Sequence, residues 1–212
     1  RLKTVLMAVL IGSALLLGSG FAYATEAAQV WQSGARSLPV YSVERTDNKI
    51  AISFDCAWGT EHTDAILSAL AEAGVRATFF TVQLWTEIRA ELESSSQAIT
   101  AVTGKPVTLF RPPYGDYDDL LIDTCRDMGI MPVQWDVDSL DWKDLSAADI
   151  AERIISRVKS GSIILCHNNG LHTAEALPIV IDALHAKGFT FFFFFDMLYY
   201  EIYTIDVTGR QH

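Results

Sequence analysis

Five polar residues of this sequence stand where short apolar runs end, and their side chains are suited to acid–base chemistry. They are Asp55, Arg111, Asp136, Asp138 and His167. A carboxylate can act as a general base and an imidazole as a general acid, and each needs a partner that tunes its pKa. If the apolar runs are parallel strands, their carboxyl ends open onto one face and bring these residues together. A helix cap or a turn explains any one of them, but the coincidence favours a site for acyl transfer to water.

The segments around these residues alternate between apolar runs and helical periodicity. Short apolar runs predict strands at residues 49–54, 76–82, 107–110, 130–135, 162–166 and 189–195. Periodic apolar positions predict helices at residues 63–73, 88–102, 120–128, 146–158 and 174–187. Strands that alternate with helices predict an α/β fold with a mostly parallel sheet, either barrel-like or open and doubly wound. No glycine-rich loop follows the first strand, which counts against a nucleotide-binding open sheet.

Two further segments carry structural predictions. Residues 38–48 are expected to add one extra strand and a turn before the core. The run of phenylalanines at 191–195 predicts a strand buried on both faces, which would promote aggregation if it were exposed. A functional aromatic platform is the alternative interpretation of this run.

Composition limits the classes of protein and of partner. The chain has 212 residues, half of them apolar, which suits one sizeable hydrophobic core. Its net charge is −10 and it contains no block of Lys or Arg, so nucleic acid is excluded as a partner. The three cysteines form no C-x-x-C pair, and we expect each to be a small buried apolar residue.

The first residues have the pattern of a targeting segment. Arg1 and Lys3 precede an apolar run over residues 5–21, and residues 22–24 form an A-x-A cleavage pattern. This predicts either a cleavable signal peptide or a retained membrane anchor over residues 1–24. Both alternatives place the folded domain, residues 38–212, outside the cytoplasm, secreted or tethered to the membrane.

Four motifs occur in the order found in polysaccharide deacetylases, the enzymes with a NodB-homology domain. They are SFDCAWG at residues 53–59, RPPYG at 111–115, DSLDW at 138–142 and LCH at 165–167. The first motif most resembles that of the sporulation-associated branch. The resemblance implies a distorted (β/α) barrel that deacetylates N-acetylhexosamine units of peptidoglycan or a chitin-like polymer, so cell-wall glycan is the expected partner.

The resemblance also implies roles for four catalytic residues. Asp55 matches the general base that activates water, and Arg111 matches the arginine that holds this base in place. His167 matches the general acid that protonates the leaving amine, and Asp141 matches the carboxylate that tunes this histidine.

Three more residues match the family's oxyanion and substrate pocket. Tyr114 matches the residue whose backbone N–H stabilises the oxyanion. Trp142 and Leu165 match the residues that line the pocket for the acetyl methyl group.

The family's divalent metal, Zn²⁺ or a similar ion, is expected as a cofactor, but its ligands are largely missing. Cys56 occupies the position of a family ligand, and residues 81–110 contain no histidine where the family has a pair one helical turn apart. One βα unit, on the order of 30 residues, is expected to be missing between Glu87 and Ile88. The sequence therefore leaves three alternatives: a shortened deacetylase, a non-catalytic glycan-binding pseudoenzyme, and a truncated inactive gene product.

Overall fold

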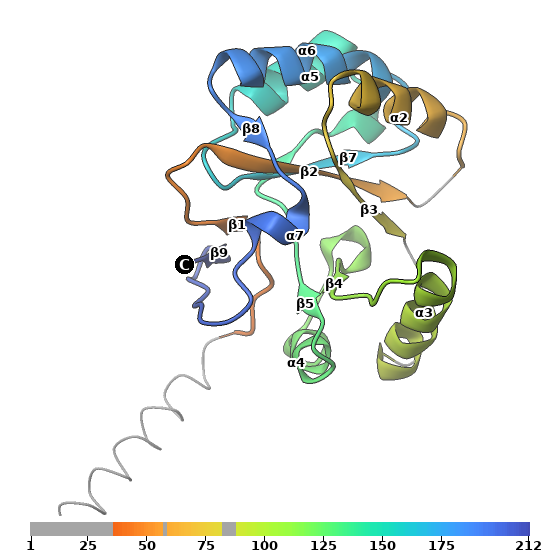
Figure 1. Ribbon diagram of the computed structural model, residues 1–212, viewed down its shortest axis with the longest axis vertical. Helices are drawn as coiled ribbons and strands as arrows, with labels where there is room; N and C mark the ends of the chain where they lie inside the picture. The colour runs from red at the N-terminus through yellow and green to blue at the C-terminus, as the bar shows by residue number, and fades with distance from the viewer. Residues whose placement is uncertain (1–35, 57–58, 82–87) are drawn as a thin grey trace, which may run out of the picture. The chain divides into compact units, whose positions relative to one another are not determined.

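The computed structural model describes residues 36–56, 59–81 and 88–212. The folded unit comprises Leu38–His212 (Figure 1). The predicted signal peptide or anchor, residues 1–24, lies outside the described residues. Among the helices that are described, none is both long and apolar enough to cross a membrane.

The principal sheet is built around one long central strand. This strand, β2 (Lys49–Cys56), pairs with β3 (Thr78–Thr81), β7 (Ile163–His167) and β8 (Thr190–Phe191). The sheet continues from β7 to β6 (Val137–Asp138). Every one of these pairings is parallel. The predicted α/β fold with a mostly parallel sheet is therefore confirmed.

Two short parallel pairs accompany the principal sheet. One joins β4 (Leu109–Phe110) to β5 (Met131–Pro132). The other joins β1 (Ser42–Val43) to β9 (Arg210–Gln211), so the extra strand expected within residues 38–48 is present in short form. In the described part of the chain β3 and β4 are not paired, and the strands do not close into a single sheet.

Three helices cover one face of the principal sheet. They are α2 (Thr63–Glu72), α5 (Ala147–Ile155) and α6 (Thr173–Ala186), and Figure 1 shows them together beside β2 and β7. Side chains of a strand alternate between its two faces. On β2, Phe54 therefore packs into the core under these helices, whereas Asp55 projects to the opposite face.

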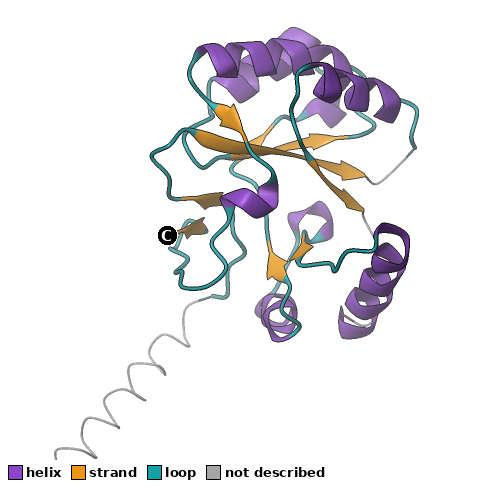
Figure 2. Cartoon of the chain, viewed as in Figure 1, coloured by secondary structure: helices purple, strands orange, loops and turns teal. Residues whose placement is uncertain are grey.

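The other helices lie on the far side of the sheet from α5 and α6 (Figure 2). They include α3 (Ile88–Thr103) and α4 (Asp119–Asp127), which contact each other. Short single turns follow two strands: η1 (Pro113–Gly115) after β4 and η2 (Asp141–Lys143) after β6. These two turns begin within the motifs that follow β4 and β6.

The strand predicted over residues 130–135 is shorter than expected. Only β5 (Met131–Pro132) forms there, and β6 begins at Val137. Pro132 has no N–H to donate to a ladder, and the next residue, Val133, forms a bridge with Val40. The segment therefore pairs with different strands along its length. An apolar run in the sequence does not reveal such a change of strand partner.

The prediction of a strand buried on both faces at residues 191–195 is wrong, and the strand predicted over residues 189–195 is short. The strand β8 ends at Phe191, and α7 (Phe194–Met197) follows. Of the five phenylalanines only Phe194 is fully buried, and 37% of Phe195 is exposed. The Lys49 ammonium group lies 4.2 Å from the centroid of the Phe192 ring. A cation therefore covers a face of this ring that was expected to pack against apolar side chains.

Candidate active site

A buried ion pair joins the carboxyl end of β2 to the residue that follows β4. Arg111 donates from Nη1 to Oδ1 of Asp55 at 2.8 Å and from Nη2 to the carbonyl of Gln134 at 3.0 Å. Both side chains are almost fully buried, and the guanidinium carbon lies 4.2 Å from the Phe80 ring centroid. Burial lowers the pKa of Arg111, and the Asp55 carboxylate opposes that effect. Arg111 thus fixes the orientation of the Asp55 carboxylate.

A second pair joins β7 to η2. Asp141 is completely buried and accepts hydrogen bonds from Nδ1 of His167 at 2.7 Å, from the His167 backbone N–H at 2.8 Å and from the Thr173 hydroxyl at 2.7 Å. Burial lowers the pKa of His167, but the hydrogen bond and charge of Asp141 outweigh it, so this pKa is raised. Burial likewise raises the pKa of Asp141, yet the contacts from His167 and Thr173 leave it lowered.

The hydrogen bond to the ionised Asp141 decides which ring nitrogen of His167 remains available for proton transfer. An ionised carboxylate only accepts hydrogen bonds, so Nδ1 of His167 must be the donor to Asp141. The other ring nitrogen, Nε2, is left to give or take a proton. A raised His167 pKa favours the protonated imidazole, which is the form that a general acid needs.

The two pairs lie on neighbouring strands. Asp55 is in register with His167, so both side chains project from the same face of the sheet at its carboxyl edge. The backbone N–H of Asn168 also donates to the Asp55 carbonyl at 3.3 Å and ties the two strand ends together. The structure therefore brings Asp55, Arg111, Asp141 and His167 together at one edge of the sheet, whereas their catalytic roles stay a prediction.

The carboxylates of Asp136 and Asp138, by contrast, accept hydrogen bonds from nearby backbone N–H groups. Asp136 accepts from the Ser162 hydroxyl at 2.9 Å and from the Ile163 N–H at 2.8 Å, and burial raises its pKa. Asp138 accepts from the Leu140 N–H at 2.9 Å and so stabilises the turn into η2. These two residues are therefore turn and cap formers. The second carboxylate of the candidate site belongs to Asp141.

The predicted pocket residues occupy the turns and the strand beside these pairs. Tyr114 in η1 has φ 58°, an unusual conformation for a residue with a side chain, and 72% of it is exposed. Trp142 in η2 is 53% exposed. Leu165 is buried and projects from the same face of β7 as His167, two residues further along. The roles of Tyr114, Trp142 and Leu165 stay predictions.

The donor atoms near Asp55 do not fit a catalytic zinc site, which needs about three protein ligands. Asp55 is engaged by Arg111, and the neighbouring Cys56 offers a single thiol, whose pKa burial and the Asp55 charge raise to about 11. Within the described residues no group of three or more His, Cys, Asp and Glu side chains could hold a metal ion.

Sequence reasoning missed three residues that support the site. Thr173 donates its hydroxyl to Asp141, and the Gln134 carbonyl accepts from Arg111. The Asn168 side chain donates to the carbonyl of Gly59 at 2.9 Å, at the end of the first motif. For Asn168 the signal in the sequence is a polar residue beside an apolar run, because a buried polar group needs a partner. Gln134 acts through its backbone carbonyl, which its residue type does not reveal.

Comparison with known proteins relates this chain to a protein family. The polysaccharide deacetylase family model matches residues 42–88 and 83–133, which include the motifs around Asp55 and Arg111. The family model, the names of the relatives and the structural neighbours together support a polysaccharide deacetylase domain in this chain.

Individual relatives are distant. YlxY of Bacillus subtilis, an uncharacterized protein, is 24% identical over 184 residues, covering 71% of this chain and 57% of YlxY. The peptidoglycan-N-acetylglucosamine deacetylase PgdA of Listeria monocytogenes is 25% identical over 187 residues, covering 73% of this chain and 40% of PgdA. This chain thus spans less than two thirds of the length of either curated relative.

A solved structure shares the fold. It is a mutant of BA3943 from Bacillus anthracis, described as a CE4 family pseudoenzyme with restored enzymatic activity. It superimposes with a TM-score of 0.71 at 25% identity, covering 76% of this chain and 71% of that chain.

Proposed function

We propose that this chain recognises N-acetylhexosamine units of cell-wall glycan, peptidoglycan or a chitin-like polymer, as a deacetylase whose hydrolytic rate is strongly reduced. One observation carries the proposal: the Asp55–Arg111 and His167–Asp141 pairs lie side by side, while the described residues around them supply no metal ligand set. The relative PgdA, by its name, acts on N-acetylglucosamine of peptidoglycan.

The two pairs are suited to the proton transfers of amide hydrolysis. Asp55, oriented by Arg111, would take a proton from an attacking water. His167, whose pKa is raised by Asp141, would give a proton from Nε2 to the leaving amine. The left-handed turn at Tyr114 supports a role for its backbone N–H in stabilising the oxyanion.

These groups account for only part of a deacetylase rate. Acid–base assistance contributes roughly 10²–10⁴-fold. A bound metal that polarises an acetamide carbonyl supplies several kcal/mol more, and each 1.36 kcal/mol is about a tenfold change in rate. Because the donor set does not fit that metal, we expect weak zinc binding and slow release of acetate.

We further propose that the domain is a shortened (β/α) barrel from which one βα unit is missing. The unpaired edges of β3 and β4 support this, because the family model matches in two pieces that meet at residues 83–88, between these strands. The alignment with YlxY runs over 184 residues but covers only 71% of this chain. This chain therefore has fewer residues than YlxY has within the aligned region. A βα crossover of about 30 residues would fill such a gap.

An insertion tests the shortened barrel and the reduced activity together. A βα segment with two histidines one helical turn apart, placed between Glu87 and Ile88, should raise both zinc content and acetate release from chitooligosaccharides. The matched control carries the same segment with both histidines replaced by alanine. An insertion that folds but gains neither zinc nor activity over this control would contradict the proposal.

A non-catalytic glycan-binding role is the second candidate. The misfit between the donor set of the described residues and a catalytic metal favours it. Calorimetric titration with N-acetylglucosamine oligomers tests this role. Binding that persists in Asp55→Asn but weakens in Trp142→Ala, without acetate release from either the original chain or the insertion variant, would support it.

We also propose that the domain acts outside the cytoplasm, where cell-wall glycan is found, either secreted or tethered to the membrane. The support is the charged and apolar pattern of residues 1–24. Cell fractionation tests the location. Full-length protein that is soluble in the cytoplasm would contradict it.

A further inference from the structure

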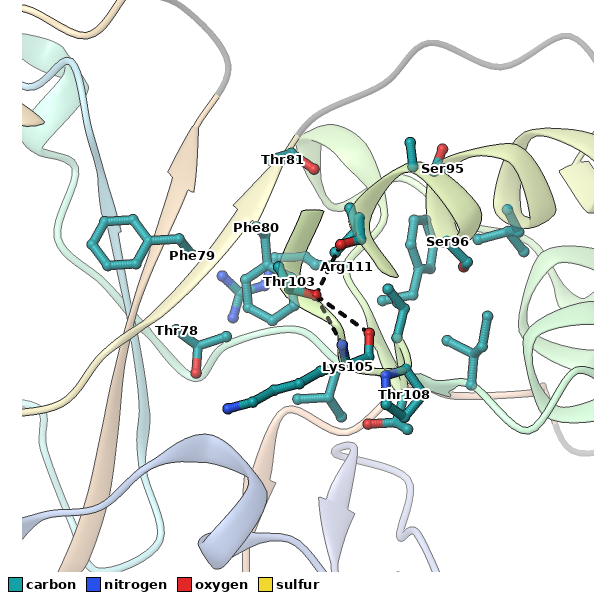
Figure 3. Close-up of a pocket in the computed structure, with 18 of the residues that line it drawn as sticks. Thr78, Phe79, Phe80, Thr81, Ser95, Ser96, Thr103, Lys105, Thr108 and Arg111 are labelled. Atoms are coloured by element: carbon teal, nitrogen blue, oxygen red, sulfur yellow. Dashed lines mark hydrogen bonds between the residues drawn. The ribbon is translucent and has the colours of Figure 1, made fainter. Parts of the chain in front are cut away.

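The two pairs of the candidate active site differ in their surroundings. Arg111 is among the residues that line a cavity of about 660 Å³ between β3, α3 and β4 (Figure 3), whereas Asp141 and His167 are not among its lining residues. Asp141 is completely buried and accepts hydrogen bonds from both β7 and the first turn of α6. The charge of the second pair is therefore governed by the side chains that enclose this carboxylate.

The two oxygens of Asp141 share their hydrogen bonds unevenly. Oδ1 accepts from Nδ1 of His167 at 2.7 Å. Oδ2 accepts from the His167 backbone N–H at 2.8 Å and from the Thr173 hydroxyl at 2.7 Å. Of these three donors, the Thr173 hydroxyl is the one that does not belong to His167. It can therefore change the charge of Asp141 without touching the imidazole.

Gly170 leaves the space in which the Thr173 hydroxyl lies. A Cβ atom at position 170 would overlap with Oγ1 of Thr173 and would lie 3.1 Å from Oδ2 of Asp141. The backbone of Gly170 is outside the left-handed region, so its conformation does not require a glycine. The missing side chain at this position instead allows the hydroxyl to reach the carboxylate.

The start of α6 also favours a negative charge at this point. Thr173 is the first residue of this 14-residue helix, and the N-terminal end of a helix carries a partial positive charge. The hydroxyl of Thr173 donates to Asp141, while the N-cap residue, His172, makes no capping hydrogen bond with its side chain. The hydroxyl and the helix end thus both stabilise the ionised form of Asp141.

The titratable groups that act on His167 come from three elements. Burial lowers the pKa of His167, and three carboxylates raise it: Asp141 on η2, Asp55 on β2 and Asp138 on β6. Asp141 alone among these three accepts a hydrogen bond from the imidazole in the described structure. At the start of α6, His172 and Glu175 pair with each other at 3.2 Å.

We propose that Thr173 is a positioning residue that acts on His167 through Asp141, by taking up part of the negative charge of Oδ2 and so limiting how strongly the carboxylate attracts the imidazole proton. A hydrogen bond donated to a carboxylate stabilises its charge. Without the hydroxyl, the Asp141 anion would be destabilised more beside a neutral imidazole than beside an imidazolium. Loss of the hydroxyl should therefore favour the imidazolium.

The hydroxyl would keep the His167 proton transferable. A general acid works best when its pKa is near the working pH, so a carboxylate that held this proton too firmly would slow its transfer. This consequence for hydrolysis rests on the proposed function. The effect of Thr173 on the protonation of His167 does not, because it can be measured without turnover.

NMR titration of the full chain tests the proposal, with the His167 resonance assigned by its loss in His167→Gln. Thr173→Val keeps the shape of the side chain but removes the hydroxyl, and should raise the pKa of His167 by roughly half a unit. Thr173→Ser keeps the donor and should hold this pKa close to its original value. Thr100→Val, at an exposed position of α3, is the matched control and should not change it.

A double-mutant cycle tests the route through the carboxylate. In an Asp141→Asn background, Thr173→Val should no longer raise the pKa of His167, because the charge that the hydroxyl shares is gone. An equal rise in that background would overturn the proposal. It would mean that the hydroxyl acts on the imidazole by another route.

An unchanged or lowered His167 pKa in Thr173→Val, with circular dichroism that matches the original chain, would also overturn the proposal. Thr173 would then only support the start of α6. Thr173→Ala removes the hydroxyl without any branched side chain and gives the same comparison if Thr173→Val does not fold. A chain that releases no acetate but shows the expected rise would contradict a deacetylase function and still support this role of Thr173.

Discussion

The helices α6 and α3 are similar in length but differ in what they bury. Helix α6 buries six residues against the sheet and α5, whereas α3, with 16 residues, buries only Leu92. Both sequences have apolar residues at helical spacing. Most helical stability in proteins comes from tertiary packing of such a stripe, so a stripe without a partner contributes little. The comparison shows that α3 packs on α4 through Leu92 but buries far less of its apolar stripe than α6 does.

The candidate active site is divided between these two regions. Asp55 and His167 lie on β2 and β7, within the packed region covered by α2, α5 and α6. Arg111, which follows β4, belongs to the region around α3 and reaches across to Asp55. Asp55, His167 and Asp141 are thus held by the well-packed part of the fold, while Arg111 comes from the region that lines the cavity between β3 and β4.

The largest effect is expected in the packed region. Phe54 is completely buried under the helices, and its ring stacks on that of Phe79 at 5.0 Å between centroids. Phe54→Ala should lower the free energy of unfolding by about 3–5 kcal/mol, through lost burial and the cavity left behind. Urea unfolding measures this. A loss below about 1 kcal/mol would mean that this region is no better packed than the surroundings of α3.

A somewhat smaller loss is expected at the buried carboxylate of the site. Asp141→Asn removes the charge and one of the two acceptors that serve His167 and Thr173, and should cost about 1–3 kcal/mol. The pKa of His167, followed by NMR titration, should fall because its charged partner is gone. Asp182→Asn, on the exposed face of α6, is the control and should stay within about 0.5 kcal/mol. An unchanged His167 pKa would refute the coupling of this pair.

The same pair predicts a pH dependence of stability. Because the folded His167 pKa lies above its ordinary value of 6.5, the folded state binds the proton more tightly than the unfolded state. Its stabilising contribution is complete below pH 6.5 and is lost as the pH rises through the raised value. Urea unfolding at several pH values, with His167→Gln as the reference, measures this difference. A contribution that grows with rising pH in this window would contradict the assignment.

The smallest effect is expected on α3. Ile99→Ala should change the free energy of unfolding by less than about 0.5 kcal/mol, because Ile99 faces the open cavity and has little packing to lose. Hydrogen exchange should also be faster for the amides of α3 than for those of α6. A loss of several kcal/mol, or equal protection of both helices, would show that α3 has a packing partner in solution.

Much of the fold was predictable because the pattern of apolar residues is local. The helix predicted over residues 146–158 forms as α5 with Ser146 as its N-cap, and the Asp149 N–H donates to the Ser146 hydroxyl. The partners of a strand are not local, which is why the segment containing Pro132 was assigned too long a strand. The phenylalanine run failed for another reason: hydrophobicity predicts burial, but at Phe192 the partner that covers the ring is the Lys49 cation.

The site was predictable to a similar degree. Strand ends predicted that Asp55 and His167 would meet, and their register follows directly from the parallel pairing of β2 and β7. The same rule included Asp136, whose carboxylate turns to the backbone of Ile163. Sequence position places a residue at a strand end but does not decide whether its side chain reaches the site or satisfies a nearby N–H, since that depends on the local turn.

Within the part of the chain that the structure describes, two acid–base pairs lie together, but no set of side chains could hold a catalytic metal. The most direct test measures zinc by mass spectrometry and acetate release from peptidoglycan or chitooligosaccharides on the same preparation of the purified domain. We predict far less than one zinc per chain and slow acetate release. One zinc per chain together with brisk acetate release that Asp55→Asn abolishes would contradict the account.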